Sequence, residues 1–102
     1  MAIRHVVMWK LADQSKVEKV ALAQSLALAL TELEGQIDGL DSITAEPDTL
    51  DEPGSWDLVL IADLKDKAAL DAYQAHPLHV EVGKKLKAAV ISRAAVDFEV
   101  ID

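Results

Sequence analysis

Apolar and polar residues alternate with a period of two along residues 3–11, IRHVVMWKL. The odd positions are apolar apart from His5, and the even positions are apolar at Val6 and Met8 and charged at both ends. A period of two is typical of a β-strand. Because both faces are apolar at the centre, we predict a strand that is covered on both sides.

Three later segments also have the pattern of strands. Residues 56–64, WDLVLIADL, form the clearest one, with Trp56 and every second residue after it on one face and Val59 and Ile61 on the other. Residues 40–50 form a weaker strand, which Pro47 restricts to the edge of a sheet because proline cannot donate to a ladder. The last segment, residues 91–101, alternates between two faces. Val96, Phe98 and Val100 occupy one, and Ala95, Asp97 and Glu99 occupy the other.

Two helical regions lie between these strands. The sequence SKVE is a capping box that begins the first helix at Ser15, and apolar residues then recur at helical spacing until Gly35 or Gly39. Asp66 caps the second region, which breaks at Pro77 because proline disfavours helical geometry in the residue before it. A further helical piece is expected over residues 78–90.

The order strand, helix, strand, strand, helix, strand predicts an α+β fold of the ferredoxin-like type, an antiparallel sheet with helices on one face. Residues 1–102 form one domain. The other sheet face would expose Val6, Met8, Val59 and Ile61, and such an apolar patch usually marks a protein interface. We therefore predict a homodimer in which two sheets pack face to face. The alternative is that these residues are scattered apolar residues of the surface.

Composition and charge exclude several classes of partner. The formal net charge of −8 argues against binding to nucleic acid and to anionic membrane surfaces. The absence of cysteine excludes disulfides and thiolate zinc sites. The sequence also has neither a signal-peptide pattern nor an apolar run long enough to span a membrane, and we expect a cytoplasmic protein.

The segment DAYQAHPLHV gathers the single tyrosine and two of the three histidines, at Tyr73, His76 and His79. In one interpretation His79 removes a proton from an activated carbon, Tyr73 stabilises the resulting oxyanion, and no cofactor is needed. The start of a new helix at Pro77 would lower the pKa of His79 and favour its neutral form.

In a second interpretation these residues are structural. His76 then caps the helix after the break, Tyr73 buries its ring, and His79 and His5 bond to each other or to the backbone. A metal site is a third interpretation, but the spacing His-Pro-x-His is not typical of metal ligands, and we predict none. The nearby Lys84, Lys85 and Lys87 form the only basic cluster. They can attract an anionic substrate or simply form a solvated helix face.

The first strand IRHVVMWKL with His5, the strand WDLVLIADL and the run LDAYQAHPLHVEV together resemble the stress-responsive A/B barrel family, often called Dabb. The resemblance covers essentially the whole chain, and its most specific part is Tyr-x-x-His-Pro-x-His. It implies a dimeric ferredoxin-like α/β barrel. Most members of the family have no assigned reaction, although a plant polyketide cyclase belongs to it.

The resemblance implies that the catalytic tyrosine and histidine of that cyclase correspond to Tyr73 and His79, with His5 nearby. The first helix here is rich in Ala and Leu where the cyclase has aromatic residues, so the substrate is not carried over. We expect a pocket between sheet and helices for a small, partly apolar ligand, with Trp9, His76 and Trp56 as further ligand-binding candidates. The alternatives are a non-catalytic stress-associated structural or binding dimer and a cofactor-free oxygenase on a similar fold.

Overall fold

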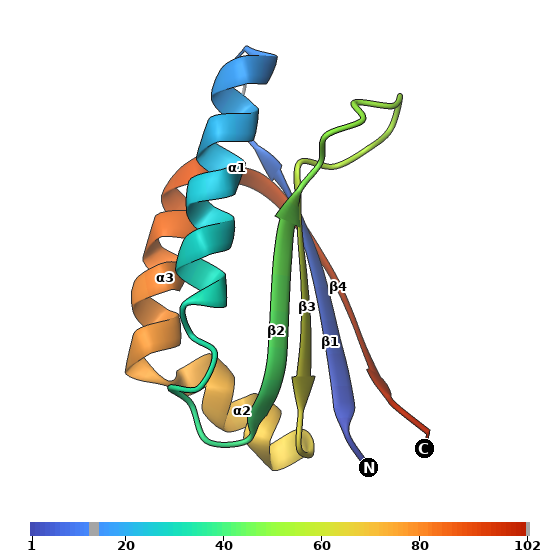
Figure 1. The fold of residues 1–102 in the computed structure, drawn as a ribbon, viewed down its shortest axis with the longest axis vertical. Coiled ribbons are helices and arrows are strands. Elements are labelled where there is room, and N and C mark those ends of the chain that lie inside the picture. Colours follow the sequence, from blue (N-terminus) through green and yellow to red (C-terminus); the bar gives the residue numbers. More distant parts are fainter. Residues whose placement is uncertain (13–14, 102) are drawn as a thin grey trace.

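The computed structural model describes residues 1–12 and 15–101, which form one sheet and three helices (Figure 1). The elements follow one another as β1 (Ile3–Leu11), α1 (Lys16–Thr31), β2 (Leu40–Pro47), β3 (Leu58–Leu64), α2 (Lys67–Ala75), α3 (Pro77–Ala89) and β4 (Val90–Glu99). This order confirms the predicted ferredoxin-like fold. The second helical region consists of two helices, which meet at His76.

The four strands are antiparallel to their neighbours and lie in the order β2-β3-β1-β4. The two central strands are β1 and β3, where Val6 lies opposite Ile61 and Met8 lies opposite Val59. On its other side β1 pairs with β4, which places Asp97 opposite His5 and Arg93 opposite Trp9. The sheet therefore brings residues from the two ends of the chain together.

One face of the sheet is buried beneath α1 and α3 (Figure 1). The odd positions of β1 and the even positions of β3 point into this core, together with one side of each helix. The fully buried large side chains are Tyr73, Leu11, Leu30, Leu58, Leu60, Leu64 and Val7. His5 is the only polar residue of the described chain in this buried set, at 2% exposure. A buried polar residue of this kind needs a hydrogen-bond partner.

The opposite face, which we call the open face, has no helix over it in the described part of the chain (Figure 1). It carries the predicted patch, with Met8 at 39% and Ile61 at 40% exposure, and β4 adds Val96 at 62% and Phe98 at 45%. Val6 and Val59 lie between them and are half-buried. The patch is continuous across three strands, so these apolar residues are clustered rather than scattered.

Side-chain caps begin each helix as the sequence predicts. The Ser15 hydroxyl accepts a hydrogen bond from the Glu18 amide at 3.3 Å, and the Asp66 carboxylate accepts one from the Ala69 amide at 2.8 Å. At the start of α3 the ring nitrogen of His76 accepts a hydrogen bond from the Leu78 amide at 3.1 Å. Pro77 occupies the first turn of α3, where its missing N–H costs nothing.

Two boundaries that differ from the prediction are the end of α1 and the start of β3. The helix α1 ends at Thr31, and a series of turns follows it as far as Gly39. Gly39 has a φ of +84°, which favours glycine. A Cβ at this position would also lie 2.7 Å from the Cβ of Ala69, so both the backbone conformation and the packing require glycine. The strand β3 begins at Leu58, so Trp56 precedes it and is not part of its buried face. No helix in the described residues has the length and apolarity needed to cross a bilayer.

Candidate functional site

A cavity of about 270 Å³ lies between the sheet and the helices α1 and α3. Its apolar walls come from β1, β3 and the facing sides of the two helices, and its polar groups come from β1, α2, α3 and β4. The lining residues are His5, Val7, Trp9, Leu30, Leu60, Gln74, His79, Gly83, Leu86, Lys87, Val90 and Arg93. Predominantly apolar walls with a few convergent polar groups are typical of sites for small molecules.

His79 lies in the first turn of α3, because Pro77 begins that helix two residues earlier. Its Nδ1 is 3.2 Å from the carbonyl oxygen of Gln74 at the end of α2. A carbonyl oxygen only accepts, so Nδ1 carries the proton and donates it. In the neutral ring Nε2 then has a free lone pair. The break between α2 and α3 therefore fixes the tautomer in which Nε2 is the base.

Burial lowers the pKa of His79 below its ordinary value, and positive charges at His5, Arg93 and His76 lower it further. The hydrogen bond to Gln74 acts in the opposite direction. The sequence analysis predicted a lowered pKa, which is confirmed, but it attributed the effect to the helix terminus, whereas removal from water is the largest cause. His79 is consequently neutral near pH 7 and able to accept a proton.

His5 points from the centre of β1 into the core, where its Nδ1 donates a hydrogen bond to a carboxylate oxygen of Asp97 on β4. The Asp97 side chain is 41% exposed, whereas that of His5 is 3% exposed. Asp97 thus links the buried ring to solvent and fixes its orientation, as a carboxylate commonly does for a functional histidine. The sequence analysis placed Asp97 on this face of the last strand but gave it no role. The available signal was an acid on one face of the last strand, together with the only polar residue on the otherwise apolar odd face of β1.

Tyr73 is fully buried on α2, next to both histidines. Its ring centroid is 4.5 Å from that of His79 and 6.2 Å from that of His5. Burial raises the pKa of Tyr73 to about 12, so the hydroxyl remains protonated and is a donor. This hydroxyl has no hydrogen-bond partner among the described residues. Tyr73 lies behind the two histidines and is not itself among the residues that line the cavity.

The other predicted ligand-binding residues, Trp9, His76 and Trp56, lie at three different places. Trp9 lines the cavity with His5 and His79. His76 does not line it, because its ring caps α3. Trp56 lies at a different place, a depression of about 590 Å³ on the open face, where Lys10 lies 5.1 Å from the centroid of its ring.

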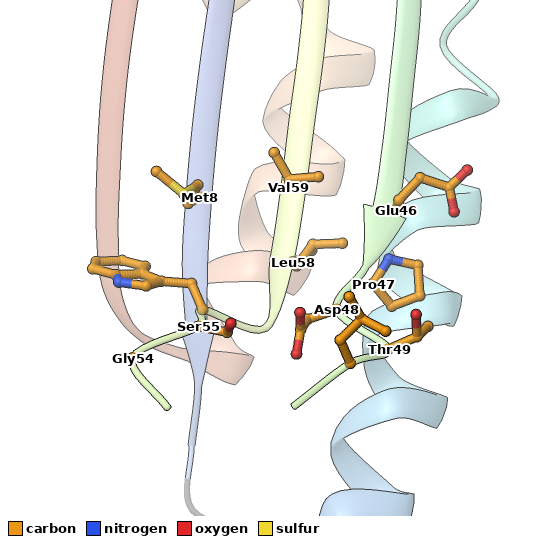
Figure 2. A pocket seen from close by; sticks show the side chains of 11 residues that line it. Met8, Glu46, Pro47, Asp48, Thr49, Gly54, Ser55, Leu58 and Val59 are labelled. Carbon is orange, nitrogen blue, oxygen red and sulfur yellow. The ribbon is translucent and has the colours of Figure 1, made fainter. Parts of the chain in front are cut away.

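Figure 2 shows that depression, with Met8 and Val59 on adjacent central strands and Glu46 and Pro47 on β2. Met8 and Val59 also belong to the apolar patch of the open face. Trp56 therefore lies beside the surface on which we predict a second subunit, and it precedes β3 instead of belonging to that strand as predicted.

Gln74 and Arg93 were not identified from the sequence as site residues, and Lys87 was named only as part of the basic cluster that can attract an anionic substrate. Gln74 supplies the carbonyl that orients His79, Arg93 projects from β4, and Lys87 belongs to the last turn of α3. The alternation of β4 places Arg93 on the same face as Asp97, which was the signal for it. In the described part of the chain, no three histidine or acidic side chains converge as metal ligands would.

Comparisons with known proteins agree with this fold. The family model described as Stress Responsive A/B Barrel Domain matches residues 3–100. A search of curated proteins finds no match. Among solved structures, a protein of Bacteroides fragilis is 31% identical, with a TM-score of 0.85 and coverage of 97% of this chain and 96% of that one. It is described as a dimeric protein of unknown function with a ferredoxin-like fold.

A dimeric ferredoxin-like protein of unknown function from Thermobifida fusca is 27% identical, covers 98% of this chain and 92% of its own, and has a TM-score of 0.83. A Dabb family protein with a ferredoxin-like fold from Mesorhizobium loti is 19% identical, with coverage of 99% and 98% and a TM-score of 0.76. The family model spans nearly the whole chain, and these structures share its fold from end to end. The chain therefore belongs to the stress responsive A/B barrel domain family.

Proposed function

We propose that the protein binds a small, partly apolar carbonyl compound in the cavity between sheet and helices and catalyses proton transfer at the carbon next to the carbonyl. One observation carries the proposal. A neutral histidine with a fixed tautomer, His79, lies at an apolar cavity beside a buried, unpartnered tyrosine hydroxyl. Acid and base groups with shifted pKa values in such a place are typical of catalytic sites.

In the proposed step, Nε2 of His79 takes a proton from the carbon next to the carbonyl. The electron pair of that C–H bond forms a carbon–carbon double bond, and the carbonyl π pair moves onto the oxygen. We propose that the bound ligand displaces the rings of His5 and His79 far enough for the buried Tyr73 hydroxyl behind them to donate a hydrogen bond to this oxyanion. His79, now protonated, returns the proton to the same carbon or to another one, so no cofactor is consumed. We assign this role to Tyr73 because its hydroxyl has no other partner in the described chain.

His5 also lines the cavity, and Asp97 bonds to it from outside the lining. The Nδ1 of His5 is occupied by Asp97, which leaves Nε2 of His5 as the remaining polar atom of that ring. We propose that His5 orients the ligand and, through its positive charge when protonated, keeps His79 neutral.

The direct test is hydrogen–deuterium exchange, followed by NMR, on a panel of small aryl-alkyl ketones and the corresponding keto acids. Wild type should accelerate exchange next to the carbonyl, and His79→Gln should lower that rate by about 100-fold or more, as expected for loss of a general base. Gln24→Ala, at an exposed position of α1, serves as the control and should keep the rate.

Either of two results would overturn the proposal. One is a wild-type protein that exchanges no compound of the panel, which favours a binding or structural dimer. The other is an unchanged rate in His79→Gln. Oxygen uptake with an electron-rich aromatic, without exchange, would point instead to a cofactor-free oxygenase.

We further propose that the protein acts as a homodimer joined through the open faces of two sheets. The support is the continuous apolar patch of β1, β3 and β4, together with the description of the Bacteroides fragilis and Thermobifida fusca relatives as dimeric. Packing the two patches against each other would remove them from water and close the barrel. The cavity with His79 lies on the opposite side of each sheet and would remain accessible.

A further inference from the structure

The polar lining of the cavity has only one sign of charge. Its polar residues are His5, Gln74, His79, Lys87 and Arg93, and no aspartate or glutamate is among the residues that line it. Asp97, which is bonded to the lining residue His5, does not itself line the cavity. In a chain with 18 acidic and 10 basic residues, a cavity without an acid is an exception.

Arg93 and Lys87 differ from half of the other eight basic residues of the chain, which form ion pairs. Four basic side chains each lie within 4 Å of a carboxylate: Arg4, Lys16, Lys67 and Lys84. Within residues 1–12 and 15–101, neither Arg93 nor Lys87 has an ion pair or a side-chain hydrogen bond. Their donors are therefore available to a ligand.

The two residues approach the cavity from different elements. Arg93 lies on β4 opposite Trp9, and Lys87 lies on α3 one helical turn after Gly83, which also lines the cavity. Arg93 is near enough to His79 for its charge to influence that ring. Both cations are exposed, whereas His5 is buried and His79 is half-buried, so the cations mark the entrance and the histidines the interior.

We propose that the ligand of this cavity carries a carboxylate, held at the entrance by Arg93 and Lys87, on an apolar body that reaches toward His5 and His79. Guanidinium groups match carboxylates through two parallel hydrogen bonds, and a lysine adds a second positive charge. A volume of about 270 Å³ lies at the small end of ligand pockets and suits a small ligand.

This inference uses the site of the proposed function and narrows its substrate to small keto acids or other carboxylated carbonyl compounds. The carboxylate at the entrance would direct the carbonyl inward, toward the base. The apolar walls, formed by Val7, Trp9, Leu30 and Leu60, would cover the rest of the molecule.

The test measures binding, without turnover, by NMR titration at constant ionic strength. The probes are phenylacetate, 3-phenylpropanoate and 4-phenylbutanoate, each compared with its primary amide and with phenyl phosphate. We expect at least one carboxylate to bind about tenfold more tightly than its amide, with shifts at His79 and Arg93. In Arg93→Gln that preference should fall to about twofold or less, while the amide binds as before.

Lys85→Gln is the matched control, because it removes one positive charge from α3 at an exposed position that does not line the cavity. If Lys85→Gln and Arg93→Gln lower the preference for carboxylates over amides equally, the preference comes from the overall positive charge near α3 and not from a specific contact. That result would overturn the proposal. So would carboxylates that bind no better than their amides at concentrations up to about 10 mM. If phenyl phosphate binds most tightly of all the probes, the entrance recognises a phosphate and the proposal of a carboxylate ligand is wrong.

The proposed proton-transfer chemistry and the proposed carboxylate ligand can be disproved independently. If carboxylates bind through Arg93 but no compound exchanges deuterium, the acid–base chemistry is wrong and the ligand class stands. If neutral ketones exchange through His79 but carboxylates show no preference, the ligand class is wrong and the chemistry stands.

Discussion

At the scale of single residues, the site depends on which polar groups have a hydrogen-bond partner and which do not. His5 is satisfied by Asp97, and His79 is satisfied on one side by the Gln74 carbonyl. The Tyr73 hydroxyl is the exception, since nothing in the described chain bonds to it. An unsatisfied buried group lowers stability, so its retention needs a reason other than folding.

Tyr73→Phe tests that reason because it keeps the ring and removes only the hydroxyl. We expect the free energy of unfolding to stay the same or to rise by about 1 kcal/mol, while the exchange rate with ketones falls. Chemical denaturation and the NMR exchange assay provide the two measurements. A loss of about 1 kcal/mol would mean that the hydroxyl has a structural partner, and the assigned role would then fail.

The sequence allowed prediction of Tyr73, His79 and His5 as a group, but not of their partners. Their proximity followed from a short motif and a family resemblance. The Asp97 contact depends on the register between β1 and β4, which join opposite ends of the chain. Single-sequence patterns set the faces of a strand and leave its register open, so Asp97 was placed on a face of the last strand without a role, and Arg93 was not singled out.

At the scale of elements, α3 has two functions. Its first turn holds His79 against the end of α2, and its middle forms one wall of the cavity at Gly83. Glycine within a helix lowers stability by roughly 1 kcal/mol relative to alanine. A Cβ built at Gly83 meets no atom within 4 Å, so packing does not demand glycine there. Gly83 lines the cavity, and the absence of a side chain keeps the space beside it open for a ligand, which explains the glycine.

Substitutions at Gly83 should therefore separate stability from binding. Gly83→Ala is expected to raise the free energy of unfolding by about 1 kcal/mol, and Gly83→Leu to keep the fold while weakening binding of phenylalkyl carboxylates by about tenfold or more. Thermal denaturation and NMR titration provide the measurements. Ala88→Leu, exposed on the same helix and outside the cavity, is the control. Undiminished binding in Gly83→Leu would show that the ligand lies elsewhere.

Element boundaries were predicted less well than element types. The prediction of β1 agreed with the structure residue for residue, and the break at Pro77 was found because proline and a histidine cap act locally. The end of α1 was placed too late because Leu33 and Ile37 continue the helical spacing and are indeed buried, although they lie in turns. Burial alone does not make a segment helical.

At the scale of the whole molecule, the two faces of the sheet have separate tasks. The helix side encloses the cavity, and the open face carries the apolar patch together with the depression at Trp56. The alternation of β1 and β3 already indicated that both faces would be covered. What the sequence left open was which apolar positions gather, and the structure adds Val96 and Phe98 from β4 to the predicted four.

A charge at the centre of the open face should abolish the dimer. Val6 lies between Ile61 and Val96 on the neighbouring strands, so Val6→Glu would bury a carboxylate in the interface. Light scattering should give twice the chain mass of 11.0 kDa for wild type and the single chain mass for the variant. Leu28→Glu, at an exposed position of α1, should remain dimeric. A monomeric wild type would contradict the proposed assembly.

The most direct measurement for the account as a whole is an NMR titration of the histidine side chains in wild type and in His5→Gln. The account predicts that His79 carries its proton on Nδ1 when neutral and titrates below the ordinary value of about 6.5. It also predicts that its pKa rises in His5→Gln, because one of the charges that lower it is gone. A His79 that titrates at or above about 6.5, or that is protonated on Nε2 when neutral, would not be a base for a bound carbonyl compound, and the proposed chemistry would be contradicted.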